Sequence, residues 1–386
     1  MPTSQTLPSE AAVSAGPAGD VIVEPVAPAP APAPRRGRLP ALDGMRFVAA
    51  TVVMLHHLVI APYAWHGTTG KVFHPLLVAT TAYGFLGVEF FFLISGFVIC
   101  MSSWGRSLGQ FFTSRVTRLY PAYWAAMAVT TLVVWYVADG NATVKLSKWD
   151  RLVNLTMFQE PLNIADVDTV YWTLWVEMRF YLLFAIVVFL GVTYRRVLAF
   201  CVLWSVAAIL VTAVGNSEAQ YLLVPNSAPF FVAGIAFYLM HRNGPNVILW
   251  GVIGFSFAVG QHNVIQRWQG TEDIMRHKMP EAPVHIAVTV FFVLMAALAL
   301  GWLDRINWGF LTTLGALTYP VYLLHCEAGW ALVRALRGHY NANLVVAMVV
   351  AWVFLVAWLI HVLVEKRLAP RLGTLVKKSF ATMPRD

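Results

Sequence analysis

The chain has 386 residues, of which 59% are hydrophobic and 12% are charged, and its formal net charge is +8. Soluble domains carry about 25% charged residues, so this composition excludes an ordinary soluble protein and predicts a multi-pass membrane protein. The positive charge does not indicate a nucleic-acid partner, because the basic residues form no cluster on a soluble domain and membrane proteins collect them at the cytoplasmic ends of their helices.

The chain begins with a segment that is too poor in large apolar residues to fold. Residues 1–39 are rich in Ala, Pro and Ser, contain the repeat APAPAPAP and carry the basic stretch RRGR near their end. They lack the basic region and apolar run of a signal peptide. We therefore expect a disordered cytoplasmic tail at 1–39, a transmembrane domain at 40–366 and a basic cytoplasmic tail at 367–386.

Apolar runs long enough to cross a bilayer follow one another from residue 41 to residue 364. They predict an all-α integral membrane protein, a bundle of about ten transmembrane helices. The weakest run is 247–261, and the longest outside loops are expected at 139–170 and 262–284. An even number of spans places both termini on one side, and the excess of Lys and Arg there predicts that this side is cytoplasmic. The expected spans are 41–61, 84–103, 118–138, 171–191, 197–214, 225–241, 247–261, 285–303, 310–333 and 343–364.

The first span, LDGMRFVAATVVMLHHL, contains polar groups that are costly in hydrocarbon. Arg46 and His57 are eleven positions apart, so they share one helix face and lie about 16 Å apart along the axis. Such groups normally face a bundle interior or a wet cavity. An imidazole can exchange a proton near neutral pH, which makes His57 a candidate general base. The alternative, a hydrogen bond that only packs the helix against a neighbour, is favoured for His56, which points about 80° away.

The second and third spans also carry charged residues. GVEFFFLISGF buries Glu89 in an aromatic run. SRVTRLYPAYW places Arg115 and Arg118 three positions apart on one face of a helix entrance, with Tyr120 just after them. Arginine pairs suit phosphates, so this pair is a candidate site for the diphosphate of a nucleotide-bearing donor. Anchoring of a cytoplasmic helix end explains such arginines equally well.

Two later spans contain further candidates. YWTLWVEMRFYLLF places Glu177 and Arg179 two positions apart, so they do not face each other and each is expected to have a partner on another helix. LTYPVYLLH contains Tyr319 and His325. His325 is either a second acid/base or substrate ligand, or a hydrogen-bonded contact between helices.

Several common motifs are absent. The sequence has no phosphate-binding loop, no Rossmann glycine pattern, no zinc motif and no GxSxG. Its three cysteines lie in or beside apolar runs without CxxC spacing, so neither a disulfide framework nor a bound metal is expected.

Taken in chain order, these segments resemble the acyltransferase-3 family of integral-membrane acyltransferases. The matching pieces are LDGMRFVAATVVMLHH, GVEFFFLISGF, RVTRLYPAYW, WTLWVEMRFYLLF and LTYPVYLLH, which extend from about 40 to 365. Two positions depart from the family pattern. Glu89 stands where many relatives have Asp, and Met178 and Arg179 replace the Glu-Gln that commonly follows the acidic position matched by Glu177.

The resemblance implies a membrane-bound enzyme that moves an acyl group, often acetyl, from acyl-CoA in the cytoplasm to a hydroxyl. Acyl-CoA is then a substrate, and no permanently bound cofactor is expected. The roles that the resemblance and the motifs together suggest are catalysis by His57, Glu177 and Arg46, donor binding by Arg115, Arg118 and Tyr120, and substrate binding by Glu89, Trp172, Tyr319 and His325.

The acceptor is left open by the sequence. A cell-envelope or secreted carbohydrate or glycolipid is the first expectation, and a macrolide or other glycosylated natural product is the alternative. Either acceptor fits an enzyme of the cell membrane, by resemblance the bacterial inner membrane. A proton-coupled transporter is the alternative of a different class, with His57, Glu89 and Glu177 as the proton relay, although the inverted repeats typical of carriers are not evident.

Overall fold

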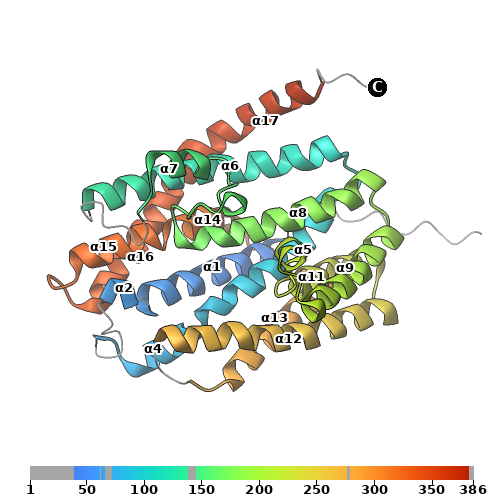
Figure 1. Cartoon of the computed structure of the whole chain (residues 1–386), viewed down its shortest axis with the longest axis horizontal. Helices are drawn as coiled ribbons and strands as arrows, with labels where there is room; N and C mark the ends of the chain where they lie inside the picture. The colour runs from blue at the N-terminus through green and yellow to red at the C-terminus, as the bar shows by residue number, and fades with distance from the viewer. Residues whose placement is uncertain (1–38, 61, 66–71, 138–144, 276–278, 382–386) are drawn as a thin grey trace, which may run out of the picture. The chain divides into compact units, whose positions relative to one another are not determined.

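The computed structural model describes residues 39–60, 62–65, 72–137, 145–275 and 279–381, so the tail predicted at 1–39 lies outside the described residues apart from Leu39. Within those ranges the regular elements are helices, and no β-strand forms there (Figure 1). In chain order they are α1 (Pro40–Ile60), α2 (Pro62–Trp65), α4 (Pro75–Ala82), η1 (Tyr83–Leu86), α5 (Gly87–Ser103), α6 (Leu108–Val137), α7 (Lys148–Asn154), η2 (Glu160–Leu162), η3 (Thr169–Tyr171), α8 (Trp172–Leu190), α9 (Tyr194–Val214), α10 (Ser217–Leu223), α11 (Ala228–Asn243), α12 (Val247–Met275), α13 (Ala282–Ala299), α14 (Gly309–Leu324), α15 (Glu327–Leu336), α16 (Ala342–Ile360), the π-helical turn η4 (His361–Glu365) and α17 (Lys366–Ala381).

The apolar helices confirm the predicted all-α membrane fold. Eight helical stretches of the described chain are long and apolar enough to cross a membrane, and α14 is a shorter apolar helix. The thirty-residue α6 is not among the eight. The number of ten spans and the side on which the termini lie therefore stay predictions.

Glycines position α1 between α5 and α14. A Cβ added at Gly87, the first residue of α5, would lie 2.8 Å from the carbonyl oxygen of Ala49 in α1. A Cβ added at Gly315 of α14 would lie 2.5 Å from the Cβ of Asp43. Only glycine permits such close approach, as is common where membrane helices pack. The two contacts hold α1 against α5 and α14, which supply other parts of the site described below.

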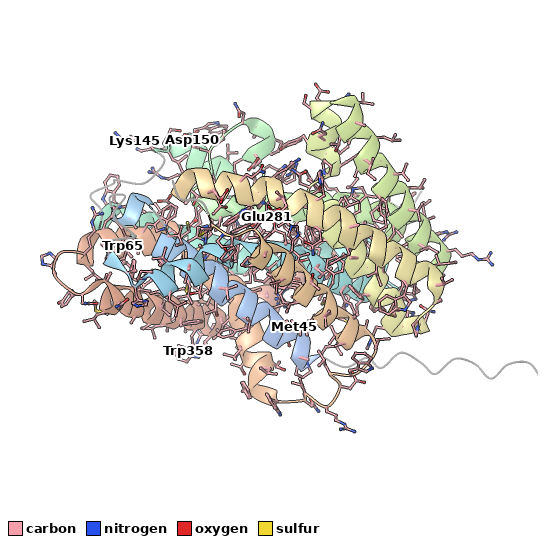
Figure 2. The ribbon with its side chains drawn as sticks, turned by 90° about the horizontal axis from the view of Figure 1, so that it is seen from below. Met45, Trp65, Lys145, Asp150, Glu281 and Trp358 are labelled. Atoms are coloured by element: carbon pink, nitrogen blue, oxygen red, sulfur yellow. The ribbon has the colours of Figure 1, made fainter. Side chains whose placement is uncertain are left out.

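The end of α1 that carries His57 is closed by two tryptophans. Trp65 of α2 donates from Nε1 to the carbonyl oxygen of Leu58 at 2.8 Å. Trp330 of α15 donates from Nε1 to the carbonyl oxygen of His57 at 2.8 Å. These indoles satisfy carbonyls that the end of a helix leaves without an intrahelical partner. Figure 2 shows Met45 and Trp65 near the two ends of α1.

The crossing of α5 and α11 brings two backbones into direct contact. A Cβ added at Gly96 would lie 2.1 Å from the carbonyl oxygen of Phe231, and one added at Gly234 would lie 2.0 Å from that of Leu93. Larger residues at either position have no room, because the atoms they would meet belong to backbone that cannot swing aside. The crossing therefore depends on both glycines.

We expect Gly96→Ala to destabilise the protein by about 1–3 kcal/mol or more, because the added methyl group forces α5 and α11 apart. The loss is measured as a lower midpoint of thermal unfolding for the protein purified in detergent. Gly251→Ala on α12 is the matched control, since no atom lies within 4 Å of a Cβ added there. Equal midpoints for the two variants would contradict the close crossing.

The span predicted at 310–333 is two helices rather than one. α14 ends before His325, and Cys326 has φ −89° and ψ −82° between α14 and α15. The Oδ2 atom of Asp168 accepts a hydrogen bond from the backbone N–H of Glu327 at 3.0 Å. This contact satisfies one of the amides that the start of a helix leaves without a partner, so the chain can turn inside the bundle. His325 therefore lies at a helix break.

The outside loop predicted at 262–284 is also corrected. α12 continues through most of it to Met275, making a helix of 29 residues. Val264 and Trp268 lie four positions apart on one helix face, and each is only 2% exposed. Burial of this face explains why the helix extends beyond the weak apolar run at 247–261.

The loop predicted at 139–170 contains helix where it is described. It forms α7 and η2 and leads into η3. Its backbone packs against α6, because the Tyr123 hydroxyl donates to the carbonyl oxygen of Asn154 at 2.7 Å and Trp124 Nε1 donates to that of Leu155 at 2.9 Å. This segment is therefore part of the helical domain.

The basic segment predicted as a tail at 367–386 forms α17 as far as Ala381. α17 packs against α6, where a Cβ added at Gly373 would lie 3.3 Å from Cγ2 of Thr117. Its basic residues thus belong to a helix that lies beside the segment carrying Arg115 and Arg118.

Candidate active site

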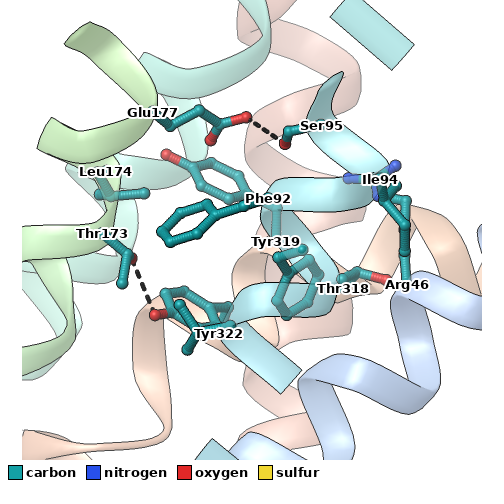
Figure 3. Close-up of a pocket in the computed structure, with 12 residues that line it drawn as sticks. Arg46, Phe92, Ile94, Ser95, Thr173, Leu174, Glu177, Thr318, Tyr319 and Tyr322 are labelled. Carbon is teal, nitrogen blue, oxygen red and sulfur yellow. Dashed lines mark hydrogen bonds between the residues drawn. The ribbon is translucent and has the colours of Figure 1, made fainter. Parts of the chain in front are cut away.

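A small pocket lies between α1, α5, α8 and α14, with a volume of about 80 Å³. This is room for a few water molecules or the tip of an extended chain, and not for a whole nucleotide. Ser95 Oγ donates to Glu177 Oε1 at 2.7 Å, and the hydroxyls of Thr173 and Tyr322 lie 2.9 Å apart (Figure 3). The pocket is lined by Arg46, Val88, Phe91, Phe92, Ile94, Ser95, Thr173, Leu174, Glu177, Thr318, Tyr319 and Tyr322.

Three arginines predicted from two motifs lie within electrostatic range of one another beside this pocket. Arg46 lines it and lies within electrostatic range of Arg118 and Glu177. Arg115 lies within range of the same two residues. The carboxylates close to Arg46 are those of Glu177 and Asp43, the second at 3.8 Å. The excess of guanidinium groups makes this region suited to an anionic group such as a phosphate.

His57 and His325 form a pair of imidazoles next to the pocket. His57 Nδ1 lies 3.1 Å from His325 Nε2 and 3.0 Å from the carbonyl oxygen of Val53. His325 Nδ1 lies 2.7 Å from the carbonyl oxygen of Tyr322. The two ring centroids are 5.1 Å apart. The structure thus brings together two candidate residues from the first and ninth predicted spans.

The carbonyl partners determine which ring nitrogens carry hydrogen. A carbonyl oxygen can only accept, so Nδ1 of each ring is the protonated nitrogen of the neutral imidazole. His325 Nε2 then accepts from His57 Nδ1–H, and His57 Nε2 keeps its lone pair. Among the described residues His57 Nε2 has no hydrogen-bond partner, and it is not a fully buried atom. It is therefore placed to accept a proton from a bound molecule.

His56 makes the contact expected of a packing residue. It is 9% exposed, and its Nδ1 lies 3.0 Å from the carbonyl oxygen of Thr81 in α4. Its ring is turned nearly perpendicular to that of His57, with an interplanar angle of 81°. The two adjacent histidines therefore face different neighbours, as their helical spacing predicts.

The imidazole pair and the pocket meet at Tyr322. This residue lines the pocket, and its ring centroid lies 5.3 Å from that of His325. His57 itself is not a lining residue. Because Arg46 and His57 share one face of α1 about 16 Å apart, the candidate site extends along α1 from the guanidiniums to the imidazoles.

Tyr322 and Ser95 are not among the site residues predicted from the sequence. Tyr322 lies three positions after Tyr319 and three before His325, a spacing that puts all three side chains on neighbouring positions of one helix face. That periodicity was available in the sequence. Ser95 is a small residue in an apolar run, and only its bond to Glu177 distinguishes it.

Arg267 is not among the predicted site residues either, because the sequence predicts an outside loop at 262–284. Arg267 donates from NH1 to Glu89 Oε1 at 2.6 Å. Its guanidinium carbon lies 4.8 Å from the ring centroid of Trp172. The two predicted substrate-binding residues Glu89 and Trp172 are thus connected through one arginine. Its neighbour Trp268, four positions after Val264, was the available signal that α12 continues this far.

Three other predicted residues are placed as follows. The Tyr120 hydroxyl donates to the carbonyl oxygen of Thr156 at 2.8 Å, and Tyr120 does not line the pocket. Tyr319 does line it, and its buried hydroxyl has no hydrogen-bond partner among the described residues. Arg179 donates to the carbonyl oxygen of Tyr221 in α10, which confirms the expected partner on another helix.

Two aspartates precede α8. Asp168 is fully buried and accepts hydrogen bonds from the backbone N–H groups of Val170 and Glu327, so it joins η3 to the start of α15. Asp166 accepts from Gln159 Nε2 at 2.6 Å. Burial raises the pKa of Asp166 to about 7, although the hydrogen bond from Gln159 acts in the opposite direction.

This shift predicts a pH-dependent stability. The pKa of Asp166 is about 7 in the folded protein against 3.8 for a free side chain, so the folded state binds more protons between these values. The free energy of unfolding therefore falls as the pH rises through that window. Asp166→Asn keeps an acceptor for Gln159 and should be more stable than wild type at about pH 8, by on the order of 2 kcal/mol. Parallel pH profiles of the unfolding midpoint for the two proteins would contradict this expectation.

Comparison with known protein families decides which chemistry these residues serve. A family model described as an acyltransferase domain matches residues 39–362. The chain belongs to the acyltransferase-3 family. The matched domain favours an acyltransferase over the transporter alternative.

Relatives of this acyltransferase-3 protein come from several bacteria. Acyltransferase MdmB of Streptomyces mycarofaciens is 32% identical over 157 residues, which are 39% of this chain and 39% of MdmB. Peptidoglycan O-acetyltransferase OatA of Listeria monocytogenes is 25% identical over 165 residues, 38% of this chain and 24% of OatA. Nodulation protein 10 of Rhizobium leguminosarum bv. viciae is 28% identical over 318 residues, 73% of this chain and 81% of that protein. The chain thus covers less than half the length of MdmB and OatA, and no solved structure gives a significant match.

Proposed function

We propose that this protein moves an acyl group, expected to be acetyl, from acyl-CoA to a hydroxyl of a cell-envelope or secreted carbohydrate. The observation that carries the proposal is the arrangement along α1. A neutral imidazole with an available Nε2, that of His57, lies on the same helix face as the guanidinium of Arg46, which belongs to an arginine cluster. A proton acceptor and an anion site in one protein are what transfer from a phosphate-bearing thioester requires.

The proposed reaction is direct transfer. His57 Nε2 takes the proton of the acceptor hydroxyl as the oxygen attacks the thioester carbonyl carbon. The C–S bond then breaks and the ester forms, and the imidazolium returns its proton to the leaving sulfur, giving CoA as the thiol. His325 Nε2 accepts from His57 Nδ1–H at 3.1 Å, which orients the base and stabilises its protonated form.

The donor is proposed to enter at the arginine cluster. Arg115 and Arg118 bind the CoA phosphates, and the narrow pocket beside Arg46 and Glu177 admits the thin pantetheine arm towards His57. The volume of about 80 Å³ agrees with an arm and excludes the nucleotide from the pocket itself. Since CoA is cytoplasmic, this role requires the predicted cytoplasmic position of the start of α6.

The name of one relative supports a carbohydrate acceptor. OatA is a peptidoglycan O-acetyltransferase by name, and its matched segment covers 38% of this chain. A hydroxyl of a macrolide or other glycosylated natural product is the second acceptor, and the same assay tests it. Both acceptors present a hydroxyl to the base.

The test uses the purified protein in lipid vesicles with acetyl-CoA labelled in the acetyl group. We expect acceptor-dependent release of CoA thiol and label that enters the glycan fraction and is removed by mild alkali, as an O-acetyl ester is. Muropeptide-bearing glycan and a glycosylated macrolide are supplied in separate reactions. If neither the thioester is consumed nor any acceptor labelled, the proposed donor is wrong.

A further inference from the structure

A larger cavity lies between α9, α10, α11 and α12, away from the catalytic pocket. Its volume is about 610 Å³, which is in the range of small-molecule binding sites. In Figure 1, α9, α11 and α12 are neighbours. The polar side chains that line the cavity are mostly amides and hydroxyls, among them Ser205, Thr212, Gln220, Ser256, Asn263 and Gln266.

A second cavity adjoins the first. It has a volume of about 210 Å³ and is lined by Glu89 and Arg267. Asn226, Asn263 and Gln266 line both cavities, so these amides join the two into one compartment. We call it the amide compartment.

Two buried polar groups in the amide compartment have no partner. Ser256 is 1% exposed and lines the larger cavity, and its Oγ makes no hydrogen bond within the described chain. Glu89 is 4% exposed and lines the smaller cavity, and its Oε2 is likewise without a partner there. Buried polar groups are nearly always hydrogen-bonded in proteins, so these two atoms leave hydrogen-bonding capacity unused at the edge of the compartment.

The lining chemistry favours a neutral, hydroxyl-rich ligand. Amides and hydroxyls both donate and accept hydrogen bonds, as the hydroxyls of a sugar require. The carboxylate of Glu89 is paired with Arg267 at 2.6 Å, so the pair presents no excess charge to a phosphate or an ammonium group. A site built to hydrogen-bond hydroxyls discriminates strongly against molecules that lack them.

The amide compartment lies next to the catalytic pocket. Val88 lines the catalytic pocket, and Glu89, the next residue along α5, lines the compartment. Thr173 lines the catalytic pocket, and its neighbour Trp172 lies against Arg267. The ion pair of Glu89 and Arg267 therefore forms part of the wall between the two.

We propose that the amide compartment binds the glycosyl part of the acceptor and delivers one of its hydroxyls past the Glu89–Arg267 pair to the catalytic pocket. The inference rests on the proposed function, because it assumes a sugar-bearing acceptor. It assigns acceptor binding mainly to α9–α12, and Glu89 of α5 is the one residue suggested by the sequence motifs that lines the compartment.

The experiment measures binding directly and needs no turnover. Octyl β-D-glucoside serves as the probe, and octanol, which has the same alkyl chain without the sugar, serves as the reference. Each is added by equilibrium dialysis to the full protein in lipid nanodiscs, at concentrations that leave the discs intact, and binding to empty discs is subtracted. We expect saturable binding of the glucoside alone, unchanged in His57→Ala.

Matched variants locate the site. Gln266→Leu removes a lining amide that makes no hydrogen bond to any described residue, and it should weaken glucoside binding about tenfold. Gln269→Leu changes the same residue type three positions along α12, outside both cavities, and should bind as wild type does. Ser256→Ala should weaken binding without lowering the unfolding midpoint, because the hydroxyl it removes has no partner in the protein.

The outcomes separate the two proposals. Acetyl transfer without glucoside binding, or equal binding by Gln266→Leu and Gln269→Leu, would overturn the acceptor compartment and leave the proposed function standing. Octanol binding as tight as glucoside binding would identify the cavity as a lipid crevice and also overturn it. Glucoside binding that depends on Gln266 and Ser256, in a protein that consumes no acyl-CoA, would support the compartment and remove the proposed donor.

Discussion

His57→Ala should lower the rate of acyl transfer by about 10²–10⁴-fold in a protein that remains folded, because general base catalysis typically contributes that much. The side chain bonds to the carbonyl of Val53 within its own helix and to His325, and the helix packing described above does not depend on it. The rate is measured as CoA thiol release at saturating acetyl-CoA and acceptor. Wild-type turnover by purified His57→Ala would remove this residue from the mechanism.

The adjacent histidine provides the matched control. His56→Ala removes the same group one position away, together with its hydrogen bond to the carbonyl of Thr81 in α4. It should lower the unfolding midpoint while leaving turnover per folded molecule near that of wild type. A loss of turnover equal to that of His57→Ala would show that the assay reports damage to α1 rather than loss of a base.

Variants of His325 test its role as a positioning residue. His325→Gln retains an acceptor for the Nδ1–H of His57, whereas His325→Leu does not. The glutamine variant should therefore keep more of the turnover number than the leucine variant, with similar KM for acetyl-CoA in both. Equal losses in the two variants would mean that His325 serves packing, the alternative that the sequence left open.

Arg118→Ala should raise the KM for acetyl-CoA by about 10–100-fold with a smaller change in the turnover number. Hydrogen bonds to charged groups contribute about 1.5–3 kcal/mol, and binding made equally in the ground and transition states appears in KM. Arg118→Lys should restore only part of the affinity, since an ammonium cannot make the two parallel bonds of a guanidinium. Arg106→Ala is the control, because Arg106 is exposed in the α5–α6 connection and, unlike Arg118, is not among the charged groups that act on Arg46.

A donor without phosphates distinguishes phosphate binding by Arg118 from an effect of Arg118 on the fold or on the thioester. Acetyl-pantetheine carries the same thioester and lacks the nucleotide, so wild type should use it with a high KM that Arg118→Ala does not raise further. If the variant impairs the two donors equally, Arg118 acts on the fold or on the thioester and not on the phosphates. The prediction depends on Arg118 lying within electrostatic range of Arg46, which lines the pocket.

Much of the candidate site was predictable because residues on one helix have a known spacing. The common face of Arg46 and His57 followed from eleven positions of helix, and the different direction of His56 followed from the same periodicity. The weak run at 247–261 and the break after His325 were not predictable in this way. In both places contacts with residues distant in the sequence decide the local structure. Burial of Val264 and Trp268 extends α12. Asp168 accepts a hydrogen bond from the first backbone N–H of α15, which stabilises the break after His325.

The sequence by itself determined the membrane class, the family motifs and the helix faces, since hydropathy and periodicity are properties of neighbouring residues. Only the tertiary structure decided which polar groups meet. His57 and His325 are 268 positions apart, and Glu89 and Arg267 are 178 apart. Polar side chains between membrane helices form hydrogen bonds and ion pairs with whichever groups helix packing places next to them. This packing depends on glycine contacts, and the position of a glycine in the sequence does not show which helix will pack against it.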